Sequence, residues 1–227
     1  MRSVVIHQPE FLPWLNLFCK AALADVFVLL DNVQYLRRGF HNRNMIKSAD
    51  GARWLTLPTR KAPRETLIKD VLLDNSQEWR QSHLSALKAA YSRAEYFDPV
   101  YGMMEEILGS PWEKLSDLNA ALLEELAARM GLAASFVRAS SLPCQGRSSE
   151  LILSLCQAAG AERYICGLGS RAYLDEEAFA RAGIQVLFIP PVPWIYAQCS
   201  AGQGFVEDLS VVDYLFNQGL EAFAKAA

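Results

Sequence analysis

The sequence has no uninterrupted apolar run that approaches the roughly 18 residues a membrane-spanning helix requires. It also has no internal repeat and no low-complexity segment. Its first residues, MRSVVIHQPEF, contain one arginine and reach a proline at position 9, which is not the pattern of a secretory signal peptide. These absences predict a globular, cytoplasmic protein that does not span a membrane.

Cysteines at metal-binding or redox spacing are missing as well. The five cysteines form no CxxC motif, and none is spaced from a histidine as in a zinc site. An odd number of cysteines in apolar surroundings is typical of reduced thiols in the cytoplasm. We therefore expect free thiols, buried at Cys19, Cys156 and Cys166, and no metal ligand set. The sequence identifies no cofactor.

The chain has no overall excess of basic residues. Its net charge is −3 and its pI about 5.7, so nucleic acid is not an expected partner. The charge is unevenly distributed, because eight basic residues and only one acidic residue, Asp50, lie between positions 32 and 64. That segment carries +7, so the rest of the chain carries −10. A basic segment in an acidic protein indicates either a local anionic ligand or a solvated basic face.

Hydrophobic periodicity predicts an α/β fold. Apolar runs at 3–7 and 26–30 are typical of buried strands, and the segment 13–24 between them has helical spacing. Strand, helix and strand in this order predict a mostly parallel, Rossmann-like sheet. Two further strands are expected at 53–58 and 66–73, as a pair. We expect a single α/β domain over 1–227, with a helical insert at 76–131.

Polar residues follow the first two predicted strands. His7 and Gln8 end the first, and Asp31 follows the second. Ligands of parallel sheets bind beyond the carboxyl ends of the strands. We therefore expect His7 and Asp31 to share one cleft with Arg43 and Asn44. His7 is either a general base assisted by Asp31 or a core histidine with satisfied hydrogen bonds.

The segment 31–48, DNVQYLRRGFHNRNMIKS, is rich in amide and guanidinium groups. Amides can recognise hydroxyl groups or base edges, guanidinium groups bind phosphate or carboxylate in bidentate fashion, and lysine supplies a point charge. An anionic small molecule such as a nucleotide sugar is the ligand we expect. The alternative is that these side chains fasten their own loop to the fold. The candidate binding residues are Gln34, Arg37, Arg38, Asn42, Arg43, Asn44 and Lys47.

Two later segments add candidate ligand contacts. Gly167, Gly169 and Ser170 follow a predicted strand, where backbone N–H groups at a helix start favour anions, although a tight turn also requires glycine. Tyr196 and Gln198 lie in a proline-rich loop and suit the face of a sugar or base, or the edge of the core. A further amphipathic helix is expected at 208–219, and the helical residue His83 is expected at the surface.

Six separated motifs together resemble the WbqC-like family of bacterial proteins. In chain order they are IHQPEFLPW, ALADVFVLLDNVQY, NRNMIK, RYICGLGSRAYLD, GIQVLF and LSVVDYLFNQG. The resemblance extends from His7 to Gly219. Two positions depart from the family pattern: Asn16 stands where a glycine is expected, and Cys166 stands where a serine commonly precedes the glycines. Asn16 argues against close backbone approach at that helix.

The resemblance implies a role in bacterial surface polysaccharides, because the family is associated with polysaccharide and O-antigen gene clusters. The leading hypothesis is a transferase that adds an acyl or aminoacyl group to a nucleotide-linked amino sugar. The first strand–helix–strand unit is also similar to that of HIGH-type nucleotidylyl transferases, but the His-x-Gly-His motif is absent. The alternatives are therefore nucleotidyl transfer from ATP or CTP and a non-enzymatic binding or scaffold protein.

Overall fold

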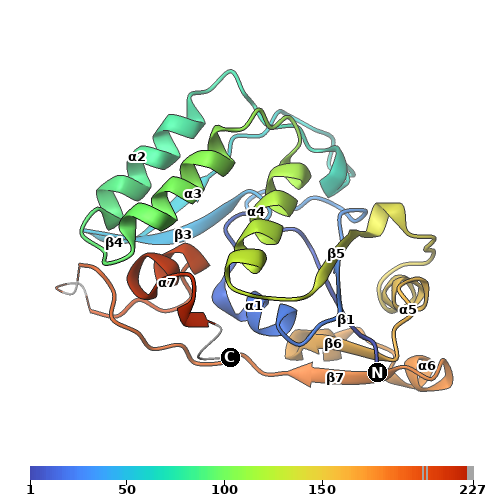
Figure 1. Ribbon diagram of the computed structural model, residues 1–227. Coiled ribbons are helices and arrows are strands. Elements are labelled where there is room, and N and C mark those ends of the chain that lie inside the picture. Colours follow the sequence, from blue (N-terminus) through green and yellow to red (C-terminus); the bar gives the residue numbers. More distant parts are fainter. Residues whose placement is uncertain (201, 203, 224–227) are drawn as a thin grey trace. The chain divides into compact units, whose positions relative to one another are not determined.

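The computed structural model describes residues 1–200, 202 and 204–223. The chain folds into two compact units, each assembled from segments that are distant in the sequence (Figure 1). Unit 1 comprises Met1–Gln8, Asn16–Asn32 and Leu132–Val192. Unit 2 comprises Pro9–Leu15, Val33–Gly131 and Pro193–Ala227. The organisation into a single domain stays a prediction.

Unit 1 contains a five-stranded, entirely parallel sheet. Its strands in chain order are β1 (Ser3–His7), β2 (Val26–Leu29), β5 (Ser135–Arg138), β6 (Arg163–Gly167) and β7 (Gln185–Ile189). They lie side by side in the order β5-β2-β1-β6-β7. Numbered among themselves, they follow the doubly wound order 3-2-1-4-5, whose direction reverses between β1 and β6. The Rossmann-like α/β class is therefore confirmed.

The strands of this sheet are apolar on both faces, as expected for a covered parallel sheet. On one face, residues of β1, β2 and β6 pack with Ile152 and Leu155 of α5 (Ser149–Ala158) and with Phe179 of α6 (Glu176–Arg181). On the other face, Val5 and Phe27 are fully buried. Helix α1 (Leu15–Ala21) connects β1 and β2. The first βαβ unit thus forms where the sequence predicts it.

Unit 2 combines a β-hairpin with helices. The hairpin pairs β3 (Arg43–Ser48) with β4 (Gly51–Thr56). The segment predicted to be helical contains three helices, α2 (Trp79–Tyr91), α3 (Phe97–Gly109) and α4 (Leu115–Arg129). A fourth helix, α7 (Val211–Gln218), begins at the cap Ser210 and ends at Gly219, which has a φ of +87°. Stacked rings of Tyr91 and Phe216, with centroids 4.4 Å apart, join α2 to α7.

The predicted strand pair at 53–58 and 66–73 is wrong in its pairing. The partner of β4 is β3, and Gly51, with a φ of +108°, supports the tight turn between them. Residues 66–73 instead contain a short 3₁₀ helix, η1 (Ile68–Asp70), flanked by isolated bridges. The strand pattern of β3 is hidden in the sequence because Asn44 and Lys47 are polar. Both side chains are nevertheless buried, since their polar groups are hydrogen-bonded.

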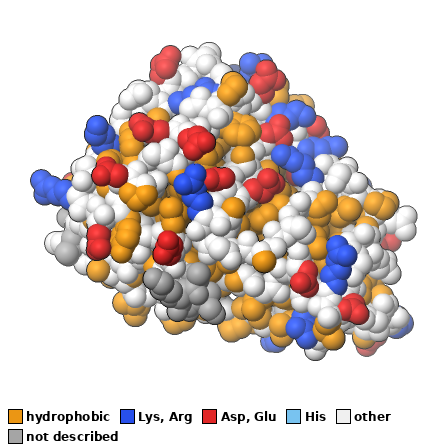
Figure 2. Space-filling view, in the orientation of Figure 1, with side chains coloured by type: hydrophobic (Ala, Val, Ile, Leu, Met, Phe, Trp, Pro, Cys, Tyr) orange, Lys and Arg blue, Asp and Glu red, His pale blue; other side chains and the backbone are white. Residues whose placement is uncertain are grey.

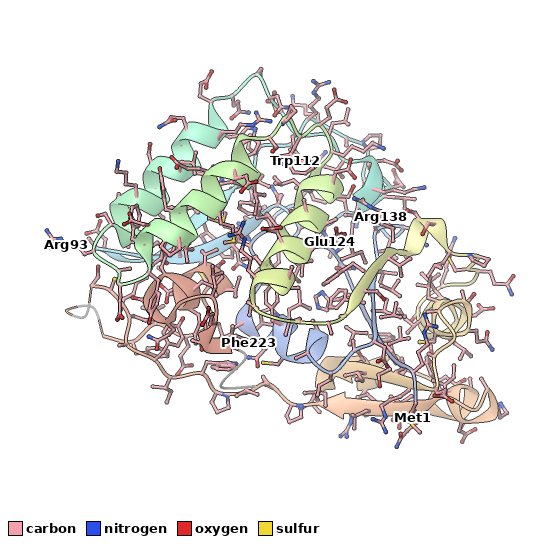
Figure 3. The ribbon with its side chains drawn as sticks, in the orientation of Figure 1. Met1, Arg93, Trp112, Glu124, Arg138 and Phe223 are labelled. Atoms are coloured by element: carbon pink, nitrogen blue, oxygen red, sulfur yellow. The ribbon has the colours of Figure 1, made fainter. Side chains whose placement is uncertain are left out.

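Figure 2 shows acidic side chains with basic ones among them on the visible face of the molecule. Glu105 and Glu106 of α3 and Glu124 of α4 are exposed. Glu124 lies on α4, and Trp112 lies in the connection before it (Figure 3). No helix among the described residues is long and apolar enough to cross a membrane.

Two expectations about individual side chains require correction. His83 is buried rather than exposed, because it packs edge-on between the rings of Phe11 and Trp79, and its Nδ1 lies 2.7 Å from the Trp79 carbonyl oxygen. Burial lowers the pKa of His83, which keeps the ring neutral. The five cysteines have free thiols, and Cys156 and Cys166 are buried as expected, but Cys19 is only half-buried.

Candidate functional site

The carboxyl ends of all five strands in unit 1 are level with one another. His7 of β1 pairs in register with Leu29 of β2, which pairs with Arg138 of β5. On the other side of β1, the register that joins Val5 to Ile165 brings the end of β6, Gly167, level with His7. The residues that follow β1 and β6 therefore flank the point where the strand order reverses. Nucleotides bind at this point in doubly wound sheets.

His7 is half-buried at this edge, and its backbone conformation is set by the last parallel pair of β1. Its Nδ1 lies 3.0 Å from the carbonyl oxygen of Gln8. A carbonyl oxygen only accepts hydrogen bonds, so this contact requires the proton on Nδ1. In its neutral form the ring then carries its lone pair on Nε2.

Gly167 and Gly169 border the same edge, next to the 3₁₀ helix η3 (Leu168–Ala172). Neither glycine has a positive φ, and a Cβ atom placed on either would meet no heavy atom within 4 Å. Ser170 is half-buried, with its Oγ 3.2 Å from Oη of Tyr173. The turn after β6 thus exposes backbone at a position where neither conformation nor packing demands glycine.

Asp31 follows β2 and is almost fully buried. Its two carboxylate oxygens accept hydrogen bonds from the backbone N–H and the hydroxyl of Ser140, at 2.9 and 2.8 Å. Ser140 belongs to η2 (Ala139–Ser141), the turn after β5. Asp31 therefore fastens the turn after β5 to the end of β2. The sequence analysis did not include Ser140, and no local pattern indicates a partner 109 residues away.

Asn16, the departure from the family pattern, also stabilises unit 1. Its Nδ2 donates to the Val192 carbonyl at 3.1 Å, and its Oδ1 accepts from the Val192 N–H at 2.8 Å. This two-way contact ties α1 to the segment after β7. The side chain thus has a structural role that glycine would not supply.

In the part of the segment 31–48 that lies in unit 2, most polar side chains donate hydrogen bonds to backbone carbonyl groups. Gln34 donates to the carbonyl of Arg64 and Arg37 to that of Ala62. Asn42 donates to the carbonyl of Leu57 at 2.9 Å, and Asn44 donates to that of Leu12 at 2.7 Å. These are the contacts expected if the side chains fasten their own loop. Burial also lowers the pKa of His41 to about 4, so this neighbouring ring is neutral.

Lys47, Tyr196 and Gln198 belong to a buried polar network around Asp213. Tyr196 and Gln198 donate to one carboxylate oxygen of Asp213, at 2.8 and 2.9 Å, and Tyr91 donates to the other at 2.8 Å. The Lys47 ammonium donates to Oε1 of Gln198 at 3.1 Å. Burial raises the pKa of Asp213, although these hydrogen bonds and the Lys47 charge oppose the rise. The network is satisfied within unit 2.

Arg38 and Arg43 differ from these residues. Arg38 is exposed with a φ of +63°. The guanidinium carbon of Arg43 lies 4.1 Å from the centroid of the Trp54 ring. Within the described part of the chain, the buried Nε of Arg43 has no hydrogen-bond partner. Trp54 was missed in the sequence because its pairing opposite Met45 depends on the hairpin register.

No group of three or more metal-binding side chains lies together among residues 1–200, 202 and 204–223. A sequence model of the WbqC-like protein family matches residues 8–225. The chain is also similar to a protein of Mycobacterium tuberculosis (strain ATCC 25618 / H37Rv) named "Uncharacterized protein Rv1507c". The two are 32% identical over 225 residues, which cover 98% of this chain and 96% of the relative. No solved structure matches the chain.

Proposed function

The chain belongs to the WbqC-like protein family, and from this premise we propose that it is a transferase of bacterial surface-polysaccharide biosynthesis that acts on a nucleotide-linked amino sugar. The association of the family with polysaccharide and O-antigen gene clusters supports the pathway. The strand order of unit 1 supports the nucleotide, because it creates a switch point between β1 and β6. We place the reaction in the cytoplasm, where the five free thiols stay reduced.

The observation that carries the proposal is the pair of glycines after β6. A glycine is needed where φ is positive or where a neighbour leaves no room for Cβ. Gly167 and Gly169 meet neither condition, whereas Gly219 in α7's cap meets both, with the Tyr96 ring 2.7 Å from a Cβ placed there. Gly102 and Gly109 in α3 meet neither condition either, so what distinguishes Gly167 and Gly169 is their place at the switch point, where a nucleotide phosphate approaches the backbone.

The chemistry we propose is acyl or aminoacyl transfer to the amine of the sugar. The amine nitrogen attacks the carbonyl carbon of an acyl thioester, a C–N bond forms and the C–S bond breaks. Nε2 of His7 takes the proton from the amine and returns it to the departing thiolate. The Nδ1 contact with the Gln8 carbonyl keeps the ring in the tautomer that this step requires. Asp31 acts indirectly, by holding the turn after β5 through Ser140.

Nucleotidyl transfer is the second candidate, because the same strand order and the same glycine turn also suit the triphosphate of ATP or CTP. The two reactions differ in their products and in their need for a divalent cation. Nucleotidyl transfer releases pyrophosphate and requires Mg²⁺ to neutralise the phosphates. Acyl transfer releases a free thiol and requires no metal.

The experiment is an assay of both products with one enzyme preparation. One set of reactions contains acyl-coenzyme A and a panel of nucleotide-linked amino sugars, and a second contains ATP or CTP, Mg²⁺ and the corresponding sugar phosphates. Both sets are run with and without EDTA, and free thiol and pyrophosphate are measured. We expect thiol release that EDTA does not affect and that His7→Gln reduces at least about 100-fold, the usual scale for loss of a general base. Pyrophosphate release that EDTA abolishes would replace the proposal with nucleotidyl transfer. Binding of nucleotides without either product would indicate a binding protein.

A further inference from the structure

Two aromatic side chains are exposed side by side in unit 2. Phe40, which precedes the hairpin, retains 48% of its accessible surface, and Trp54 in β4 retains 41%. Their ring centroids are 6.1 Å apart and the ring planes are inclined by 41°. Large aromatic side chains of a folded protein are mostly buried, so two adjacent exposed rings indicate a surface that contacts another molecule.

Arg43 makes this pair chemically specific. Its guanidinium group lies over the Trp54 ring, with the carbon 4.1 Å from the ring centroid. Its Nε is shielded from solvent, yet among the described residues it has no hydrogen-bond acceptor. A buried donor without a partner destabilises the folded state, commonly by roughly tenfold in the folding equilibrium constant. A ligand cannot reach this shielded atom either, but an anionic oxygen bound beside Trp54 would be attracted to the guanidinium charge.

The surroundings favour an anion. In the segment 32–64, six cationic side chains are exposed, and no ion pair involving them occurs in the part of the chain that the structure describes: Arg37, Arg38, Arg53, Arg60, Lys61 and Arg64. Within the segment itself, Asp50 is the only acidic residue. Exposed aromatic rings beside uncompensated cations are the combination with which proteins bind the bases and phosphates of nucleotides.

We propose that Phe40, Arg43 and Trp54, which we call the hairpin surface, form a binding site for a mononucleotide. The base stacks on the exposed aromatic rings, and the phosphate accepts hydrogen bonds from the Arg43 guanidinium. The hairpin surface lies in unit 2 and uses none of the residues at the sheet edge of unit 1. This inference is therefore independent of the proposed transferase reaction and stands or falls separately.

The test is an NMR titration of the ¹⁵N-labelled full chain with AMP, in which the indole N–H signals of the tryptophans are followed. The sequence has five tryptophans, and the Trp54 signal is the one that Trp54→Phe removes. We expect AMP to shift this signal saturably, while adenosine and ribose 5-phosphate, which each supply only half of the ligand, shift it weakly. An unchanged Trp54 signal with AMP overturns the proposal. An equal shift with ribose 5-phosphate also overturns it, because the base would then have no role.

Variants separate binding from folding. AMP binding to each variant is measured by calorimetric titration. Trp54→Ala should weaken the affinity of the hairpin surface for AMP by about fivefold to 100-fold, which is the scale of losing one base–aromatic stack. Arg43→Met, which keeps the length of the side chain, should weaken it by roughly tenfold to 100-fold. Phe205→Ala is the matched control, since Phe205 is an exposed aromatic of the same unit outside the basic segment. The melting temperature of each variant is recorded.

The sites in the two units are distinguished by Gly169→Ala. This change lies at the sheet edge of unit 1 and should leave the AMP-induced shift of the Trp54 signal unchanged. Loss of that shift in Gly169→Ala would assign the AMP site to the sheet edge and overturn the hairpin surface. Affinity that is unaltered in both Trp54→Ala and Arg43→Met would do so as well.

Discussion

Replacement of Asp213 should reveal how much unit 2 depends on its buried polar network. Asp213 has no accessible surface and accepts three hydrogen bonds, from Tyr91, Tyr196 and Gln198, at 2.8–2.9 Å. Asp213→Ala removes the acceptor of the buried Tyr91 hydroxyl, of the part-buried Tyr196 hydroxyl and of one N–H of Gln198. A hydrogen bond to a charged group contributes about 1.5–3 kcal/mol, and three such bonds are lost together in Asp213→Ala. We expect Asp213→Ala to lower the free energy of unfolding by about 3–5 kcal/mol.

The pH dependence of the stability tests the same network independently, because the direction of the change can be predicted. Burial raises the pKa of Asp213, so the folded state binds its proton more tightly than the unfolded state. The stability that this carboxyl contributes is therefore complete below about pH 3.9, its unfolded pKa, and is lost as the pH rises through the folded pKa. Asp213→Asn does not titrate and keeps one acceptor oxygen. Its deficit relative to the wild type should be about 1–3 kcal/mol at low pH and should shrink as the pH rises.

The assay is urea unfolding of the wild type, Asp213→Ala and Asp213→Asn between about pH 4 and about pH 8. Glu207→Ala is the control, because Glu207 is an exposed acid in the segment before α7 and its loss should change stability by less than about 0.5 kcal/mol. The reasoning is refuted if Asp213→Ala is as stable as Glu207→Ala. It is also refuted if the deficit of Asp213→Asn grows as the pH rises.

Three smaller predictions concern single side chains. Asn44→Ala should cost about 2–3 kcal/mol in urea unfolding, because the Leu12 carbonyl and the Met45 N–H both lose their partner, and a cost under about 0.5 kcal/mol would contradict this. Gly219→Ala should lower the melting temperature, since its φ is +87° and the new Cβ would lie 2.7 Å from the Tyr96 ring; an unchanged value would argue against the described cap. All five cysteines should react with an alkylating agent after unfolding without reductant, and any protected pair detected by mass spectrometry would indicate a disulfide.

The sheet of unit 1 was predictable because its signal is local. The runs at 3–7 and 26–30 are continuous and apolar, as expected for strands covered on both faces, and a helix of suitable length separates them. Likewise, the last helix was predictable from its apolar stripe and from Gly219. In each case the residues that form the element also carry the pattern that identifies it.

The hairpin and the roles of the polar segment were not predictable in the same way. The sequence does not show which face of β3 is buried, because the buried residues Asn44 and Lys47 are polar. Their hydrogen-bond partners, such as Leu12 and Gln198, lie far away in the sequence. The same applies to Asp31, whose partner Ser140 becomes adjacent only when β2 pairs with β5. A sequence shows that such side chains need hydrogen-bond partners. It does not show whether a ligand or the protein's own backbone supplies them.

The most direct test of the proposed transferase is the affinity of Gly169→Ala for the nucleotide-linked amino sugar that the wild type binds. The structure has room for the added methyl group, so stability should change by less than about 0.5 kcal/mol. If a ligand phosphate approaches the backbone there, the methyl group should weaken binding by about fivefold to 100-fold, the equivalent of about 1–3 kcal/mol of steric conflict. Gly102→Ala in α3, which also has free space for Cβ, is the matched control and should bind as the wild type does. Equal affinity in Gly169→Ala, Gly102→Ala and the wild type, measured by calorimetric titration, would contradict a nucleotide site at the end of β6.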